Sequence, residues 1–269
     1  MWLNWETSGY ARDPDALLWL RERWRLKIIR AAMGVEPANA YLSDPLQARR
    51  QLDAVVQNAV AAGVYVIIDW HDHNAHAHRA QAEEFFADVA ETYGELPNVL
   101  YEPYNEPERV GWESDVKPYH EALVATIRAR DPDNVIILGT PNWSQYVDEA
   151  ALSPVAGDNL LYTLHFYACT HGQWLRERAE AALGAGIGLF VTEWGATAAD
   201  GGIDGVVCLD EARTWLDWID QRGLSWTAWK LDNCSEASCY FASSAPVNGG
   251  WTTDQLQGHG PFVRERMRE

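Results

Sequence analysis

The sequence predicts a (β/α)8 barrel, a fold in which eight parallel strands alternate with helices around one core. The chain has 269 residues, close to the roughly 250 that such a barrel typically occupies as one domain. Its hydrophobic content of 47% is sufficient for a large core. Strand-like apolar segments also alternate with helix-like amphipathic segments along the chain, which is the pattern of repeated βα units.

Eight segments rich in apolar, β-branched and aromatic residues are the predicted strands. Most are continuously apolar, which is typical of parallel strands covered on both faces. The first begins almost at the start of the given sequence, so we expect the N-terminal part of this strand to be shortened. In chain order, the segments begin at residues 2, 28, 64, 98, 134, 160, 188 and 224.

Helices are predicted between these strands. The segment 45–63 shows the pattern most clearly, because Leu52, Val55 and Val56 share one helical face and Gly63 ends the helix. No linker or change of composition divides the chain, so we expect residues 1–269 to form one domain. Similar amphipathic patterns, mostly closed by a glycine, occupy residues 80–94, 116–131, 172–186 and 209–223.

Net charge and aromatic content indicate which kinds of molecule this chain can bind. The net charge of −18 repels phosphate backbones and anionic membranes, so we expect neither nucleic acid nor a membrane as partner. No apolar run approaches the roughly 18 residues that a membrane span needs. The 14 tryptophans and 11 tyrosines point weakly to carbohydrate, because aromatic faces stack on sugar rings, although a single tryptophan is more often a core residue.

Polar residues stand at the C-terminal ends of the predicted strands, where barrels carry their functional groups. One glutamate at such an end is usually solvated or paired with a cation. Two glutamates, Glu106 and Glu193, each end a strongly apolar strand, and this combination favours a functional site. They end the fourth and seventh predicted strands, which lie across the barrel mouth from each other. The other residues at these ends are Arg30, Asp69, Trp70, His71, Asn105, His165, Tyr167, Trp194 and Trp229.

Two facing carboxylates are what cleavage of a glycosidic bond requires. One must be protonated to help the leaving oxygen depart, and the other must be ionised to attack or to activate water. Asn105, beside Glu106, suits a hydrogen bond to a sugar hydroxyl near the reacting carbon.

Several motifs, in order along nearly the whole chain, resemble glycoside hydrolase family 5, and specifically its bacterial endo-β-1,4-glucanases (cellulases). The most specific are Asn-Glu-Pro at 105–107, His-Phe-Tyr at 165–167 and Thr-Glu-Trp-Gly at 192–195. The resemblance implies a barrel and a retaining, endo-acting hydrolysis of β-1,4-glucosidic bonds in cellulose or soluble β-glucans. It also implies a β-glucan polysaccharide or oligosaccharide as the partner, and we expect the enzyme to be a monomer.

The same resemblance implies a role for each matching residue. Glu106 is the expected general acid/base and Glu193 the expected nucleophile. Arg30 is expected to support Glu193 electrostatically, Tyr167 to donate a hydrogen bond to it, and Asn105 to contact the 2-hydroxyl of the substrate.

Further matching residues are expected to contact the sugar chain. His71 and His165 are expected to line the subsite where the bond breaks, and Trp229 to form a sugar platform. Trp143 and Glu236 match more variable substrate contacts.

One residue departs from the pattern of the family. Pro103 stands where such strands usually carry an aliphatic residue. Because proline has no N–H to give to the ladder, we expect the strand geometry to change just before Asn105 and Glu106.

The four cysteines are Cys169, Cys208, Cys234 and Cys239. None forms a CxxC pair, and an even count outside a metal pattern favours disulfides over four reduced thiols. In the expected barrel, Cys169 and Cys208 follow neighbouring strands, and Cys234 and Cys239 close a short loop after the eighth, so we predict these two pairs. We therefore expect a secreted, extracellular protein, with the signal peptide absent from the given sequence.

The segment 71–78 suggests a metal site as an alternative, since His71, His73, His76 and His78 cluster with Asp72. No carboxylate or further histidine stands at helical i, i+4 spacing to complete a ligand set. We therefore expect a polar loop in which only His71 faces the site, with no metal and no cofactor.

Two other hypotheses concern the sugar. A noncatalytic sugar-binding barrel would keep the aromatic platform without the chemistry, but the presence of both glutamates with Arg30, His165 and Tyr167 argues against it. An enzyme of the same fold and mechanism could instead act on mannan, xyloglucan or a mixed-linkage glucan.

Overall fold

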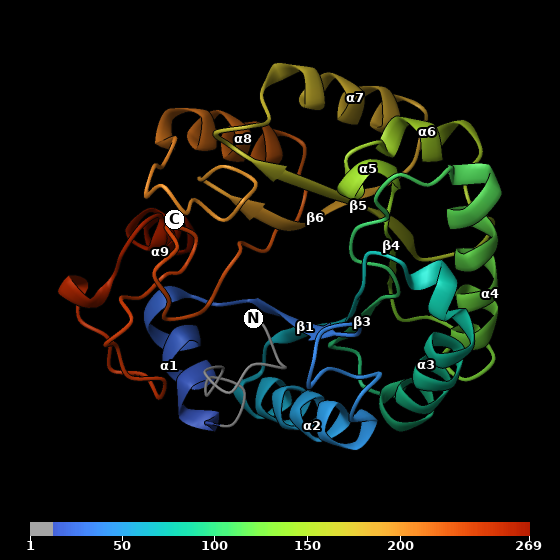
Figure 1. The fold of residues 1–269 in the computed structure, drawn as a ribbon, viewed down its shortest axis with the longest axis horizontal. Helices are drawn as coiled ribbons and strands as arrows, with labels where there is room; N and C mark the ends of the chain where they lie inside the picture. Colours follow the sequence, from blue (N-terminus) through green and yellow to red (C-terminus); the bar gives the residue numbers. More distant parts are fainter. Residues whose placement is uncertain (1–12) are drawn as a thin grey trace.

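A computed structural model describes residues 13–269 of the chain. Six parallel strands form one curled sheet, in which each strand pairs with the next along the chain. Helices surround this sheet on its outer face (Figure 1). The strands are β1 (Ile28–Gly34), β2 (Tyr65–His71), β3 (Val99–Glu102), β4 (Ile136–Leu138), β5 (Leu160–Tyr167) and β6 (Leu189–Gly195).

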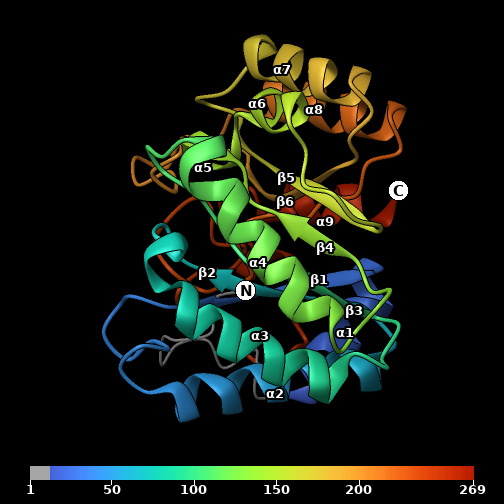
Figure 2. The same ribbon diagram turned by 90° about the vertical axis from the view of Figure 1, so that its right-hand side faces the viewer.

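The five predicted helices are all present, four of them between these strands and the fifth, α8, after β6. They are α2 (Pro45–Ala62), α3 (Arg79–Tyr93), α4 (Lys117–Arg128), α7 (Gln173–Gly184) and α8 (Leu209–Gln221). Figure 2 shows α4 crossing the outside of β3 and β4, and α7 lying beside α8. In α2, the Asp44 carboxylate accepts the Gln47 N–H at 2.9 Å, and Gly63 ends the helix at a left-handed φ of 66°.

Further helices were not predicted from the sequence. They are α1 (Pro14–Trp24), α5 (Pro141–Ser144), α6 (Val147–Leu152) and α9 (Gly260–Arg268), with the single turns η2 (Ala75–His78), η3 (Trp112–Val116) and η4 (Thr253–Gln255). None of the helices within residues 13–269 is both long and apolar enough to cross a membrane.

The predicted eighth strand at 224–231 is wrong as a regular strand. This segment lies along β6 through three backbone hydrogen bonds, but only Trp226 forms a ladder bridge, to Val191. The predicted first strand, at residue 2, lies outside the described residues. Six parallel strands in sequential order with helices outside nevertheless confirm the (β/α)8 class.

The predicted fourth strand is shorter than expected. β3 ends at Glu102, immediately before Pro103, as the missing N–H of proline requires. Glu106 therefore lies four residues beyond the strand rather than at its last position. The Tyr119 hydroxyl donates to the Pro103 carbonyl at 2.7 Å and holds this turn.

The interior of the sheet carries an apolar layer of four side chains: Ile67, Leu100, Ile137 and Phe190. Side chains on one face of a strand repeat every two residues, so Asp69 and Glu102 stand next on that interior face toward the C-terminal ends. The polar residues of the site therefore pack directly on this layer of apolar side chains.

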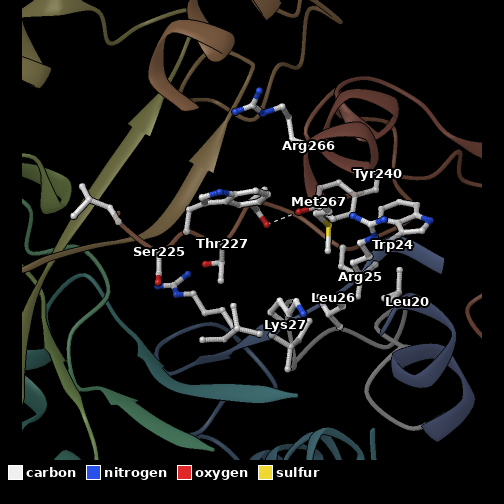
Figure 3. Close-up of a pocket in the computed structure, with 17 residues that line it drawn as sticks. Leu20, Trp24, Arg25, Leu26, Lys27, Ser225, Thr227, Tyr240, Arg266 and Met267 are labelled. Atoms are coloured by element: carbon white, nitrogen blue, oxygen red, sulfur yellow. Dashed lines mark hydrogen bonds between the residues drawn. The ribbon is translucent and has the colours of Figure 1, made fainter. Parts of the chain in front are cut away.

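A cavity of about 280 Å³ lies between β1 and the segment 224–228. Figure 3 shows Trp24 and Tyr240 in its wall, with Met267 from α9. The Tyr240 hydroxyl donates to the Ala228 carbonyl there at 2.5 Å. None of the described residues that line this cavity is an aspartate or glutamate, so the pair of glutamates predicted from the sequence does not lie there.

Both predicted disulfides are present. Cys169 and Cys208 join the segments that follow β5 and β6, with their Cα atoms 5.2 Å apart. Cys234 and Cys239 close the loop after residue 231, with a Cα separation of 5.7 Å. The pairing prediction is therefore confirmed.

Candidate active site

A second cavity, of about 570 Å³, opens at the C-terminal ends of the strands. It contains most of the predicted site residues, whereas Arg30 and Asn105 are buried beneath it. The predicted residues that line it are His71, Glu106, Trp143, His165, Tyr167, Glu193 and Trp229.

Glu193 lies in β6 and is almost fully buried. Arg30 donates to its Oε2 at 2.9 Å, and the Tyr167 hydroxyl donates to its Oε1 at 2.6 Å. Burial opposes ionisation, but the positive charges of His165 and Arg30 outweigh it and lower the pKa of Glu193 to about 2. This carboxylate is therefore ionised throughout the physiological range.

Arg30 connects the interior of the site. Its guanidinium bonds Asp69 at 2.9 Å, Glu102 at 2.7 Å and Glu193 at 2.9 Å. Burial alone would lower the pKa of Arg30, but the three carboxylates raise it above its usual value. The only cation among these groups is thus permanently charged and fixed in place.

Glu102 is a site residue that the sequence did not single out. Its buried carboxylate accepts the Thr192 hydroxyl at 2.7 Å as well as the Arg30 guanidinium. Burial raises the pKa of Glu102, against the opposing charge of Arg30. Within an apolar strand this glutamate gave no signal, because its partner Arg30 lies 72 residues away in the chain.

Glu106 lines the cavity and is held by two histidines. His165 Nδ1 lies 2.8 Å from its Oε1, and His73 Nε2 lies 3.5 Å from its Oε2. Burial opposes protonation of His165, but its hydrogen bond to Glu106 and the charge of Glu193 raise its pKa. One carboxylate oxygen of Glu106 and one of Glu193 lie within 4.8 Å of each other.

Asn105 is oriented by two neighbours. Arg30 donates to its Oδ1 at 2.7 Å, and its Nδ2 lies 3.4 Å from His71 Nε2. Its backbone carbonyl accepts the Ser144 hydroxyl at 2.7 Å, which fixes the chain on the Glu106 side of the cavity.

Two tryptophans form aromatic walls of the cavity. The Trp229 ring stacks on His71 with centroids 5.4 Å apart and an interplanar angle of 10°. The Trp143 ring lies beneath Arg109, whose guanidinium carbon is 5.8 Å from the ring centroid. Asn142 and Trp143 both have a φ of 57°, and the Trp143 N–H donates to the Pro107 carbonyl at 2.9 Å. This hydrogen bond places Trp143 beside the residue that follows Glu106.

Glu236 differs from the other predicted residues in its surroundings. It is not among the described residues that line the cavity of Glu106 and Glu193. Its carboxylate lies 3.0 Å from Lys230 Nζ and accepts the Ser238 hydroxyl at 3.2 Å.

The histidines of segment 71–78 have separate partners, respectively Asp69, Glu108, Tyr104 and Asp72. The expectation that only His71 faces the site is wrong, because His73 also lines the cavity. His171 lines it too, and its position four residues after Tyr167 was an available signal.

Three groups of described residues have donor atoms close enough to hold a metal ion. In Glu106, His165 and Glu193, the Arg30 guanidinium already occupies one carboxylate and repels a second cation. In a second group, the Asp72 carboxylate already accepts bonds from Trp70, His78 and Asn74. The third group uses the disulfide-bonded Cys234 and Cys239. We assign no metal to any of them.

Comparison with known families decides the class of this site. The family model "Cellulase (glycosyl hydrolase family 5)" matches residues 2–235. The chain belongs to glycosyl hydrolase family 5. Membership in this family agrees with the fold and with the pair of glutamates at the cavity, and it confirms the resemblance seen in the sequence.

Curated relatives of this chain are named endoglucanases. Endoglucanase A of Evansella cellulosilytica is 44% identical over 272 residues, a match that covers 99% of this chain and 54% of the relative. Endoglucanase N of Pectobacterium atrosepticum is 45% identical, with 95% of this chain and 58% of the relative covered. The chain thus spans a little over half the length of these curated relatives.

Solved structures of similar chains share the fold closely. One from Cytophaga hutchinsonii is 40% identical with a TM-score of 0.95, covering 100% of this chain and 87% of that chain. A variant of the catalytic domain of Thermobifida fusca endoglucanase Cel5A, solved in complex with cellotetraose, is 31% identical with a TM-score of 0.89 and covers 97% and 88% of the two chains.

Proposed function

We propose that this chain is a catalytic domain that hydrolyses β-1,4-glucosidic bonds within cellulose or soluble β-glucans, with retention of anomeric configuration. The observation that carries the proposal is the approach of Glu106 and Glu193 oxygens to within 4.8 Å. Retaining enzymes place the two carboxyl groups about 5 to 5.5 Å apart, whereas inverting enzymes need roughly 6.5 to 9.5 Å to admit a water.

In the first step, the ionised Glu193 attacks the anomeric carbon. The glycosidic C–O bond breaks as Glu106 gives its proton to the leaving oxygen, and a glycosyl ester to Glu193 forms. The bonds from Arg30 and Tyr167 orient the attacking carboxylate toward the sugar.

In the second step, the now ionised Glu106 takes a proton from water. The water oxygen attacks the anomeric carbon from the side that the leaving group vacated, and the ester to Glu193 breaks. Two inversions at one carbon give net retention. His165, bonded to Glu106 at 2.8 Å, stabilises the carboxylate while it is ionised.

The remaining residues hold the sugar chain. Asn105 contacts the 2-hydroxyl of the sugar at the reacting position, and His71 lines that subsite. Trp229 provides a platform for a sugar ring, and Trp143 provides a second one beside Glu106. Glu236, with its Lys230 partner, serves as an outer substrate contact.

Broader features of the proposal concern the whole molecule. We propose that residues 1–269 form one domain that acts as a monomer and without a cofactor. The two disulfides support secretion into an oxidising, extracellular environment, where polymeric β-glucan is met. The cellotetraose complex of the Thermobifida fusca relative supports a β-glucan oligosaccharide as ligand.

Release of reducing sugar from carboxymethyl cellulose, mannan and xylan in parallel tests the substrate. Cellulose should be cleaved fastest, and Glu193→Gln protein prepared identically controls for contaminating enzymes. Faster cleavage of mannan or xylan would overturn the substrate assignment.

Proton NMR of the first product tests the stereochemistry. The β-anomer of the product is expected to form first, and formation of the α-anomer first would overturn retention.

A further inference from the structure

The orientation of the Asn105 amide follows from the chemistry of Arg30. A guanidinium has donors and no acceptor, so the Asn105 atom at 2.7 Å from Arg30 Nη2 must be the carbonyl oxygen. The amide nitrogen is then the atom at 3.4 Å from His71 Nε2. An amide NH₂ only donates, so this contact requires that His71 Nε2 carry no proton.

The tautomer of His71 follows in turn. Burial and the nearby charge of Arg30 hold the pKa of His71 well below its usual value, so the ring is neutral. A neutral imidazole with a bare Nε2 carries its proton on Nδ1. The acceptor for that Nδ1–H is Asp69 Oδ2, at 2.8 Å.

Asp69 is completely buried, and its two oxygens differ in their surroundings. Oδ2 lies 2.8 Å from His71 Nδ1 and 2.9 Å from Arg30 Nη2. Oδ1 has no hydrogen-bond partner among the described residues. A buried oxygen without a partner costs stability, and such exceptions concentrate where a side chain is held for function.

We propose that Asp69 is a positioning residue that acts through His71 on Asn105. It holds His71 as the Nδ1–H tautomer, and the bare Nε2 then fixes the Asn105 amide so that its second N–H is aimed at the substrate 2-hydroxyl. This inference rests on the proposed function and adds to it the residue that sets recognition of that hydroxyl. Contacts to the 2-hydroxyl strengthen in the transition state, so loss of Asp69 should lower the rate of the chemical step.

The chain offers a matched control. Asp72 is also buried and lies in the same segment, and its Oδ2 lies 2.8 Å from Nδ1 of His78. His78, however, is not among the described residues that line the cavity. Asp72→Ala therefore removes a buried aspartate that orients a histidine, without touching His71 or Asn105.

The kinetic test uses two substrates, 2,4-dinitrophenyl β-cellobioside and the analogue that lacks the 2-hydroxyl on the sugar bearing the aryl group. Asp69→Ala should lower kcat/KM on the first by about 10- to 100-fold, because the contact to the 2-hydroxyl that Asp69 positions strengthens in the transition state. On the 2-deoxy analogue the loss should stay within about threefold, since the group on which Asp69 acts is missing.

Two further variants complete the set. Asp69→Asn keeps an acceptor for the His71 N–H and should recover much of the activity on the hydroxylated substrate. Asp72→Ala should leave the ratio of the two substrates unchanged. An equal loss by Asp69→Ala on both substrates would overturn the inference, because Asp69 would then act through Arg30 and Glu193. Absence of any loss would also overturn it.

The tautomer itself can be measured without turnover. In ¹⁵N-histidine-labelled wild-type protein, with His71 assigned from the spectrum of His71→Gln, Nδ1 should appear protonated and Nε2 bare. The opposite tautomer would overturn the inference even if Asp69→Ala failed to fold. Failure of wild-type protein to cleave either aryl substrate would instead refute the proposed function and leave the tautomer assignment standing.

Discussion

The Tyr167 hydroxyl lies 2.6 Å from Oε1 of Glu193, and both side chains are buried, one on β5 and the other on the adjacent β6. Burial raises the pKa of Tyr167 well above its usual value, so this hydroxyl keeps its proton and donates it to the carboxylate. The bond restrains the proposed nucleophile on the side opposite Arg30, which occupies Oε2.

Tyr167→Phe removes this bond and little else. We expect kcat to fall by about 10- to 100-fold, because hydrogen bonds to charged groups are typically worth about 1.5 to 3 kcal/mol. KM should change little, since the hydroxyl contacts Glu193 rather than the sugar. The matched control is Tyr162→Phe on the same strand, whose hydroxyl accepts the Val155 N–H at 2.9 Å. A loss of kcat as large in the control would refute the role of Tyr167.

The two glutamates should separate by their response to the leaving group. Glu106→Ala should form the glycosyl-enzyme from a dinitrophenyl cellobioside at a substantial rate but fail on cellulose, because a nitrophenolate departs without a proton. Assistance by a general acid is typically worth about 10² to 10⁴ in rate. Glu193→Ala should be inactive on both substrates.

Added azide should assign the two roles independently of the rates. In Glu193→Ala the anion replaces the nucleophile and should yield the α-glycosyl azide. In Glu106→Ala it should displace Glu193 from the intermediate and yield the β-azide. NMR of the trapped products decides the outcome, and reversed configurations would mean that nucleophile and acid have been exchanged.

The two disulfides should contribute unequally to stability. Cys169 and Cys208 are 39 residues apart, whereas Cys234 and Cys239 are 5 apart. Loop-closure entropy then predicts that loss of the first costs about 4 kcal/mol of unfolding free energy and loss of the second about 2 kcal/mol. Urea unfolding of the two double Cys→Ser variants measures this, and equal losses would contradict the entropic account.

Acid should destabilise the fold through its buried histidines. Burial lowers the pKa of His120, His171 and His259 to about 4 each. Below the usual value near 6.5 the unfolded chain therefore binds protons that the folded chain does not, so the unfolding free energy falls as pH falls from about 6.5 to about 4. His259→Gln should reduce this slope in urea titrations at several pH values. An unchanged slope would show that His259 titrates normally in the fold.

Much of the fold could be predicted from sequence because its signals are local. The helix at 45–63 shows an apolar stripe, a proline at its start and a glycine at its end, and α2 follows it to within a residue. The segment at 224–231 looks equally strand-like, but whether it pairs regularly depends on β6 and not on its own residues. Short elements such as α5, in which Asn142, Trp143 and Ser144 adopt a left-handed φ, have no periodic signal.

The site could be predicted where a motif ends or closely follows an apolar strand, and the structure brings Glu106, Glu193, His165 and Tyr167 into one cavity. Their catalytic roles stay predictions. Glu102 could not be found this way, because a buried carboxylate in an apolar strand has meaning only beside its distant guanidinium partner.

The guanidinium of Arg30 is the single positive charge among three carboxylates, Asp69, Glu102 and Glu193. Burial raises the pKa of Asp69 to about 7 and also raises the pKa of Glu102. The negative charge of the three carboxylates therefore exceeds that of Arg30 only where the pH is high enough to ionise one of these two besides Glu193. A neutral pyranose gains little from that excess, whereas the oxocarbenium-like species at the top of the reaction barrier carries positive charge toward it. We therefore expect the pocket to bind a protonated iminosugar more tightly than an uncharged lactam of matching ring shape, and inhibitor design can start from that difference in charge.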